Sequence, residues 1–352
     1  AEVVAMSNFG FVPPVELEGE AVCVQHTRGE FGVCVGKVYV WDLDETLLVF
    51  NSLLSGSLEI SGVRPDKEKA ATLASFASQV EDMIYSLAER EFHFTTLEGR
   101  NHWCFDAALQ HDDVSVDVEH YDFGRDGLKM RSDEDEPASA WERRLEGLRY
   151  RQVKRRYVRA REGDAGRSEV IGESAEPAKG VIEAVDRLTE GWLTTADEVL
   201  QSVWQFETAV ERLHASQAPS TRMHKKEETL RFEGAGRRGA AGAGAAGSGN
   251  GRSVAVETHV NVLVTHGELV PTIVKLLLFG LEKYFHPSCI YSSREAGKTA
   301  CFSDIVRRFG SAECMVAVGD GKDEENAAAR TGMEFVKVRG PEDLRRVLEK
   351  GP

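Results

Sequence analysis

Two pairs of acidic residues stand where short apolar runs end. Asp42 and Asp44 follow the run "VYVW", and Asp320 follows the run "CMVAVG", with Glu324 one helical turn further along the chain. Mg²⁺ prefers one or two carboxylates, a carbonyl oxygen and several waters as ligands. These four acids are therefore the candidate metal ligands. One such pair alone would be weak evidence, because a surface turn explains it equally well.

A threonine and a lysine follow two further apolar runs. Thr265 ends "HVNVLVT", and Lys298 comes shortly after "CIYSS". A phosphate ester is anionic, so a carboxylate nucleophile can attack it only beside a divalent cation and a fixed ammonium group. Lys298 can supply the ammonium, and the Thr265 hydroxyl can donate to a phosphate oxygen. Asp44 can reach the leaving-group oxygen, act as a general acid and then activate water. The chemistry indicated is phosphoryl transfer.

The elements that must position these residues are strands and helices in alternation. The patterns predict strands at 38–41, 259–265, 289–293, 314–321 and 334–338, and helices at 267–285 and 298–310. Strands joined by single helices form a parallel sheet, which binds ligands at the carboxyl ends of its strands. We therefore predict an α/β fold in which the candidate residues gather at one edge of the sheet.

The middle of the chain has helical periodicity and no strand periodicity. Helices are predicted at 66–92, with Asp66 as the N-terminal cap, at 141–159 and at 178–214. The segment 234–252 is almost pure Gly, Ala and Ser, which predicts a flexible linker. The predicted organisation is an N-terminal segment of short strands or a flap (1–36), a discontinuous α/β core (37–60 and 254–350), a helical insertion (61–233) and the linker (234–252).

Three competing motifs are present. The linker begins with GxGxxG, but no helix pattern follows it. The stretch "EAGKT" would need a glycine at the position of Ser292 to be a phosphate-binding loop. Cys301 and Arg307 have the Cys-x5-Arg spacing of cysteine-dependent phosphatases. That chemistry needs a Gly-rich loop before a helix, whereas Cys301 lies inside an amphipathic pattern, so we interpret it as a core cysteine.

Composition excludes several classes of function. The 352 residues carry a net charge of −15, so direct binding to nucleic acid or to an anionic membrane is not expected. The basic run "RYRQVKRRYVRAR" is the exception, and it offers a surface for an acidic protein partner. The six cysteines include no CxxC pair, which favours reduced thiols and an intracellular protein of the cytoplasm or nucleus. No apolar run approaches the roughly 20 residues that span a bilayer.

Four stretches of the sequence resemble the Eyes absent family of protein tyrosine phosphatases, within the haloacid dehalogenase superfamily. They are "VYVWDLDETLLVFNSLLSG", "NVLVTHGELVPTIVKLLLFGLEKYF", "IYSSREAGKTACFSDIVRRFG" and "AVGDGKDEENAA". The similarity extends from residue 38 to about residue 338 and is greatest with the shorter, plant-type members. The linker is expected to be an insertion relative to the family pattern, and the resemblance includes nothing like the long transactivation region of animal members.

The resemblance implies a Rossmann-like core interrupted after its first strand by a helical cap. It also implies Mg²⁺ dependence, with Asp42 as the nucleophile that forms an aspartyl-phosphate and Asp44 as the acid/base. Thr265 and Lys298 would contact the phosphate, Asp320 would bind the metal, and Glu324 would be a further ligand, direct or through water.

We therefore expect an Mg²⁺-dependent protein tyrosine phosphatase that acts on phosphotyrosine-containing proteins. The alternatives are a small-molecule phosphomonoesterase or phosphotransferase of the same superfamily, and a scaffold or transcriptional cofactor with residual activity. A phenolate leaves more readily than an alkoxide, which is a physical reason to expect phosphotyrosine as the substrate. Aromatic residues of the helical insertion, such as Trp103 and Phe105, are candidates to contact the ring.

Overall fold

The computed structural model describes residues 23–24, 33–131, 137–203 and 256–349. Its centre is a sheet in the order β4-β3-β2-β5-β6, with every neighbouring pair parallel. The short strand β1 pairs with β2 in the antiparallel direction. The strands are β1 (Cys23–Val24), β2 (Val33–Trp41), β3 (Val256–Thr265), β4 (Ile290–Ser292), β5 (Met315–Gly319) and β6 (Glu334–Lys337). The predicted α/β class with a parallel sheet is confirmed.

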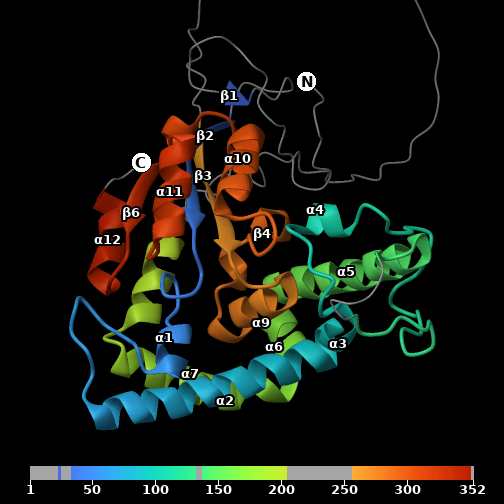
Figure 1. Cartoon of the computed structure of the whole chain (residues 1–352), viewed down its shortest axis with the longest axis horizontal. Coiled ribbons are helices and arrows are strands. Elements are labelled where there is room, and N and C mark those ends of the chain that lie inside the picture. Colours follow the sequence, from blue (N-terminus) through green and yellow to red (C-terminus); the bar gives the residue numbers. More distant parts are fainter. Residues whose placement is uncertain (1–22, 25–32, 132–136, 204–255, 350–352) are drawn as a thin grey trace, which may run out of the picture.

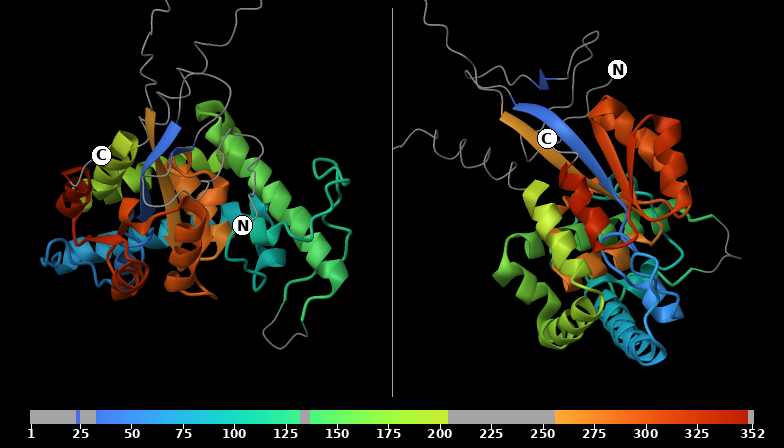
Figure 2. Two further views of the ribbon diagram at one scale, coloured as in Figure 1. Left: turned by 90° about the horizontal axis from the view of Figure 1, so that it is seen from above. Right: turned by 90° about the vertical axis from the view of Figure 1, so that its left-hand side faces the viewer.

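Each face of the sheet is buried by a different set of helices. Successive side chains of a strand point to opposite faces, so Tyr39 and Trp41 join one hydrophobic cluster and Val38 and Val40 join the other. Helices α10 (Lys298–Phe309) and α11 (Lys322–Thr331) cover the Val38 face. Helices α9 (Leu269–Phe279) and α12 (Pro341–Glu349) pack on the Trp41 face. Figure 2 shows the sheet between these two layers.

Between β2 and β3 the described elements are helices. Figure 1 shows the long helices of this insertion beside the sheet. Asp66 caps α2 by accepting a hydrogen bond from the backbone N–H of Lys69, as predicted from the sequence. The insertion contains α1 (Asn51–Ser55), α2 (Lys67–Phe92), α3 (Phe94–Leu97), α4 (Phe105–Ala108), α5 (Ala140–Arg161), α6 (Asp164–Ile171), α7 (Ala175–Leu188) and a helix at 192–203. Single turns of 3₁₀-helix lie at Gly172–Ser174, Glu282–Tyr284, Pro287–Cys289 and Ala312–Cys314.

Three predicted elements differ most from the structure. The first strand begins at Val33 rather than at 38, so the end of the predicted N-terminal segment belongs to the sheet. The helix predicted at 267–285 ends at Phe279, because Gly280 adopts a left-handed conformation with φ of 73°. The helix predicted at 178–214 is interrupted at Glu190 and Gly191, both of which have positive φ, and its part at 204–214 lies outside the described residues. The predicted linker at 234–252 lies outside the described residues.

The insertion and the sheet share one hydrophobic cluster. Leu87 of α2 and Leu200 of the helix at 192–203 belong to the same cluster as Trp41 and Val318 of the sheet. Polar contacts reinforce this packing: the Arg167 guanidinium of α6 donates to the Leu277 carbonyl at 2.8 Å, at the end of α9. Such contacts satisfy carbonyl groups that the end of a helix leaves without a partner.

The basic helix α5 is largely neutralised within the chain. Arg155 forms an ion pair with Glu119, and Arg156 forms one with Glu91. Arg149 is fully buried and pairs with Asp126 at 2.7 Å. These ion pairs make α5 less cationic than its sequence suggests. No helix within the described residues is long and apolar enough to cross a membrane.

Candidate active site

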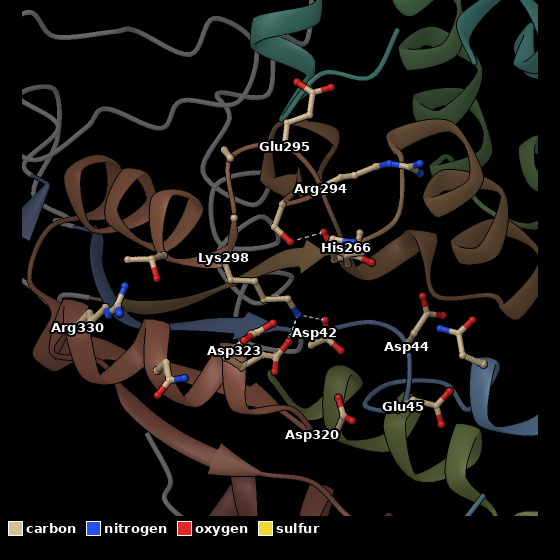
Figure 3. Close-up of a pocket in the computed structure, with 18 residues that line it drawn as sticks. Asp42, Asp44, Glu45, His266, Arg294, Glu295, Lys298, Asp320, Asp323 and Arg330 are labelled. Atoms are coloured by element: carbon tan, nitrogen blue, oxygen red, sulfur yellow. Dashed lines mark hydrogen bonds and ion pairs between the residues drawn. The ribbon is translucent and has the colours of Figure 1, made fainter. Parts of the chain in front are cut away.

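A cavity of about 720 Å³ lies at the carboxyl ends of the parallel strands. The six residues predicted from the sequence all line it: Asp42, Asp44, Thr265, Lys298, Asp320 and Glu324. They come from the ends of β2, β3 and β5 and from the first turns of α10 and α11. The fold therefore brings together residues that are up to 282 positions apart, from 42 to 324. Figure 3 shows this pocket.

Asp42 is almost fully buried, with 7% of its surface exposed. Its backbone N–H donates to the Val318 carbonyl at 2.9 Å, a bond that belongs to the pairing of Trp41 in β2 with Val318 in β5. One carboxylate oxygen contacts the Lys298 ammonium, and the other accepts from the Thr46 hydroxyl at 3.2 Å. Burial raises the pKa of Asp42 to about 7, and the Lys298 charge offsets only part of this effect.

Lys298 is the first residue of α10 and forms ion pairs with both Asp42 and Glu324. Burial lowers the pKa of Lys298, but the two carboxylates outweigh burial and the net shift is upward. Its side chain is therefore a fixed ammonium group inside the pocket. Gly297, with φ of 78°, precedes the helix and turns the chain from the loop into α10.

Glu324 lies against the backbone of the loop that follows β5. A Cβ atom at Gly319 would approach the Glu324 Cγ to 2.6 Å, so only glycine leaves room for this side chain. The Oε2 atom of Glu324 is buried and has no hydrogen-bond partner among the described residues. Burial raises the pKa of neighbouring Asp320, and the Glu324 charge raises it further. A buried oxygen without a partner is a position where a ligand would be stabilised.

Asp44 points toward a cation that the sequence analysis did not identify. Lys275 of α9 donates to both carboxylate oxygens of Asp44, at 2.7 and 2.9 Å. The same ammonium lies 4.5 Å from the centre of the Phe50 ring. In Figure 3, Asp42 lies between Lys298 and Asp44, so the two acids of the first pair contact different lysines.

The loop after β2 is held in a tight turn. The Leu43 carbonyl accepts from the backbone N–H groups of Leu47 at 2.9 Å and Leu48 at 3.1 Å. Glu45 has a φ of 62°, and its carboxylate accepts from the backbone N–H of Ser52 at 3.0 Å in α1. Glu45 therefore fixes the loop to the next helix, which keeps the two aspartates at the end of the sheet.

Thr265 is fully buried at the end of β3, and its hydroxyl accepts from the backbone N–H of Gly267 at 3.1 Å. The hydroxyl proton is thus available to donate elsewhere. The Thr265 carbonyl accepts from the Ser293 N–H at 2.7 Å, which joins the loops after β3 and β4.

The donor set fits a hard cation such as Mg²⁺. Asp42, Asp320 and Glu324 offer carboxylate oxygens in one pocket, and one Glu324 oxygen is buried without a partner. Among the described residues, no three His, Cys, Asp or Glu side chains stand close enough to form a complete metal site. Mg²⁺ typically uses one or two carboxylates and retains several waters, so it does not require such a cluster.

The cysteine and aromatic candidates lie elsewhere. Cys301 is fully buried in α10, and burial raises the pKa of its thiol to about 12. Burial disfavours the thiolate form that a nucleophile needs, in agreement with the interpretation of Cys301 as a core cysteine. The prediction that Phe105 contacts a substrate ring is wrong, because its side chain is fully buried. Trp103 packs against Tyr291, at 5.8 Å between ring centres, and does not line this pocket.

Comparison with known proteins identifies three informative relatives. Protein phosphatase EYA1 of Mus musculus is 29% identical over 317 residues, which are 88% of this chain and 44% of that protein. Protein phosphatase eya of Drosophila melanogaster is 28% identical over 321 residues, 88% of this chain and 34% of that protein. Protein phosphatase EYA of Arabidopsis thaliana is 27% identical over 304 residues, 86% of this chain and 82% of that protein. The chain thus spans less than half the length of the two animal relatives. No protein-family model matches the chain.

Proposed function

Because the chain is homologous to the Eyes absent family of protein phosphatases, we propose that it is an Mg²⁺-dependent protein tyrosine phosphatase. The observation that carries the proposal is the pocket in which Asp42, Thr265 and Lys298 meet the acids of the second pair. The homology supports a protein phosphatase, and the side chains in the pocket support an aspartate nucleophile.

In the first half of the proposed reaction, a carboxylate oxygen of Asp42 attacks the phosphorus of the substrate. The bond from phosphorus to the ester oxygen breaks, and Asp42 becomes an aspartyl-phosphate. Lys298 holds the Asp42 carboxylate and offers its ammonium to the phosphate oxygens. The Thr265 hydroxyl donates to another phosphate oxygen. The leaving oxygen departs as a phenolate or takes a proton from Asp44.

In the second half, Asp44 accepts a proton from a water molecule as that water attacks the same phosphorus. The bond between phosphorus and Asp42 breaks, which releases inorganic phosphate and restores the carboxylate. The proposed ligands of Mg²⁺ are Asp42, Asp44, Asp320 and Glu324. When bound, the cation would supply positive charge that neutralises the phosphate oxygens.

We also propose that the helical insertion (61–233) serves as a cap over the core (37–60 and 254–350), with 234–252 as its linker to β3. The substrate-facing part of such a cap would be the one nearest Asp44. The pairing of Arg155 and Arg156 with acids of the chain does not favour α5 as a binding surface for an acidic partner.

The test is a phosphatase assay on one peptide made in phosphotyrosine and phosphoserine forms. We expect Mg²⁺-dependent turnover of the phosphotyrosine form that EDTA abolishes and added Mg²⁺ restores. Asp42→Asn should lower the rate by at least roughly a thousandfold, because it removes the nucleophile. A kcat/KM for phosphoserine equal to or above that for phosphotyrosine would contradict the tyrosine specificity. Unchanged activity of Asp42→Asn would contradict the mechanism.

A further inference from the structure

A second cavity of about 810 Å³ adjoins the catalytic pocket. It is lined by α2, α3 and the beginning of α9, so it lies between the helical insertion and the core. The two cavities share Asp44, Asn51, His266 and Arg294 in their linings. We call this second cavity the adjoining pocket.

The position of Asp44 relates the adjoining pocket to the substrate. Asp42 and Lys298 line only the catalytic pocket, whereas Asp44 lines both cavities. In the proposed mechanism the phosphate lies at Asp42 and the leaving oxygen lies at Asp44. The organic part of the ester therefore extends from Asp44 into the adjoining pocket.

Aromatic side chains line the adjoining pocket. Tyr85 of α2 is 49% exposed, so its ring is accessible from the pocket. Its ring packs against Phe94 of α3, with 5.5 Å between the ring centres. Phe50 lines the same pocket beside Lys275. The exposed Tyr85 ring, supported by Phe94, provides contact area for another aromatic ring.

The charges of the adjoining pocket are biased toward acids. Arg294 pairs with Glu268 at 3.0 Å, and Lys275 pairs with Asp44. Within the described part of the chain, Glu81 and Glu98 form no ion pair. The lining of the adjoining pocket holds four acids and three cations, Arg131 included, so it carries an excess of one negative charge.

The bias extends over both cavities. Ten acidic and five basic residues line the two pockets together, with Arg131 as the remaining cation of the adjoining pocket. Burial raises the pKa of Glu268, and the nearby Arg294 charge lowers it. The Glu98 and Glu295 charges raise it further, because these acids lie close to Glu268. A bound Mg²⁺ and a phosphate dianion would cancel, so the excess of negative charge would persist in the complex.

We propose that the adjoining pocket binds the tyrosine ring and its neighbouring residues, and that it selects phosphotyrosine peptides whose neighbouring residues are basic rather than acidic. This inference rests on the proposed phosphatase function. Tyr85 and Phe94 contact the peptide side of the substrate, while Glu81 and Glu98 attract a lysine or arginine beside the phosphotyrosine. Partly exposed ion pairs of this kind contribute modestly each, so two of them correspond to about a tenfold preference.

The experiment compares two phosphotyrosine peptides that differ only in having lysine or glutamate on both sides of the phosphotyrosine. We expect kcat/KM to be about tenfold higher for the lysine peptide, and the ratio to fall as NaCl is added. The double variant Glu81→Gln/Glu98→Gln should bring the ratio close to one. Asp82→Asn is the matched control, because Asp82 is an exposed acid beside Glu81 that does not line the pocket, and it should preserve the ratio.

Substitutions of Tyr85 test the contact between its ring and the substrate. Tyr85→Ala should raise KM for the lysine peptide several-fold with little change in kcat, and Tyr85→Phe should restore the wild-type KM because it keeps the ring. Circular dichroism and the thermal midpoint establish that each variant is folded. Equal kcat/KM for the two peptides in wild type, or an unchanged ratio in the double variant, would overturn this inference. Failure of wild type to hydrolyse either peptide would instead contradict the proposed function.

Discussion

Replacing Asp42 with asparagine should stabilise the metal-free protein, and the gain should grow with pH. Asparagine keeps the shape of the side chain but removes a charge that is buried at 7% exposure. Lys298 retains Glu324 as its ion-pair partner in the variant. The substitution therefore removes one buried carboxylate without leaving the ammonium unpaired.

The sign of the effect follows from the direction of the pKa shift. Burial raises the pKa of Asp42 from 3.8 to about 7, so the folded state holds this proton over a pH range in which the unfolded state has lost it. The contribution of Asp42 to the free energy of unfolding is therefore zero below about pH 4, unfavourable above it, and complete above about pH 7. One pKa unit corresponds to about 1.36 kcal/mol, so the complete effect is about 4 kcal/mol.

The assay is urea denaturation of wild type and Asp42→Asn in EDTA at pH 5 and at pH 8.5. The stability gain of the variant should be about 3 kcal/mol larger at pH 8.5 than at pH 5. Glu282, whose burial also raises its pKa to about 7, is present in both proteins and cancels in the difference. Asp323→Asn is the control, because Asp323 lines the same pocket but is exposed. A gain that does not change with pH, or a loss of stability at pH 8.5, would refute this reasoning.

Three further predictions concern single substitutions. Cys301→Ser should leave turnover within about twofold while costing about 1 kcal/mol of stability, and thiol alkylation that abolished activity would contradict this. Trp192→Phe removes the hydrogen bond from the indole N–H to the Thr46 carbonyl at 2.9 Å. Urea denaturation should therefore show a free energy of unfolding lower by about 1 kcal/mol, and kcat should fall more than KM rises. Gly319→Ala should displace Glu324 and lower Mg²⁺-dependent activity at least about tenfold, and wild-type Mg²⁺ titration behaviour in this variant would argue against that role for Glu324.

The strand ends could be predicted from the sequence because each apolar run stops at a polar residue. Parallel strands place their carboxyl ends at one edge, so the grouping of Asp42, Thr265 and Asp320 follows from the pattern alone. The pattern contains no information about which face of a helix meets a given loop. Lys275 was missed for this reason: it lies in an apolar helix, and only the packing of α9 brings it to Asp44.

Element boundaries were also harder to predict than the elements themselves. The strand that begins at Val33 contains Gly36 and Lys37, which interrupt the apolar pattern, and its register shifts between Val35 and Val38. Pairing with β3 keeps this irregular part in the sheet, which is a tertiary effect. The long helix expected at 178–214 was broken by Gly191, a residue that the helical periodicity did not take into account.

The helical insertion contacts the loop that carries Asp42 and Asp44. The Trp192 indole, 3% exposed, donates to the Thr46 carbonyl, and the Thr46 hydroxyl donates to the Asp42 carboxylate. At the end of β4, the Ser292 hydroxyl accepts from the Asn101 side chain of the insertion at 3.1 Å. The inserted helices also share a hydrophobic cluster with the sheet. These contacts connect the insertion directly to the residues around Asp42. Substitutions in the insertion should therefore change the position of Asp42 through Thr46, even at positions that do not contact substrate.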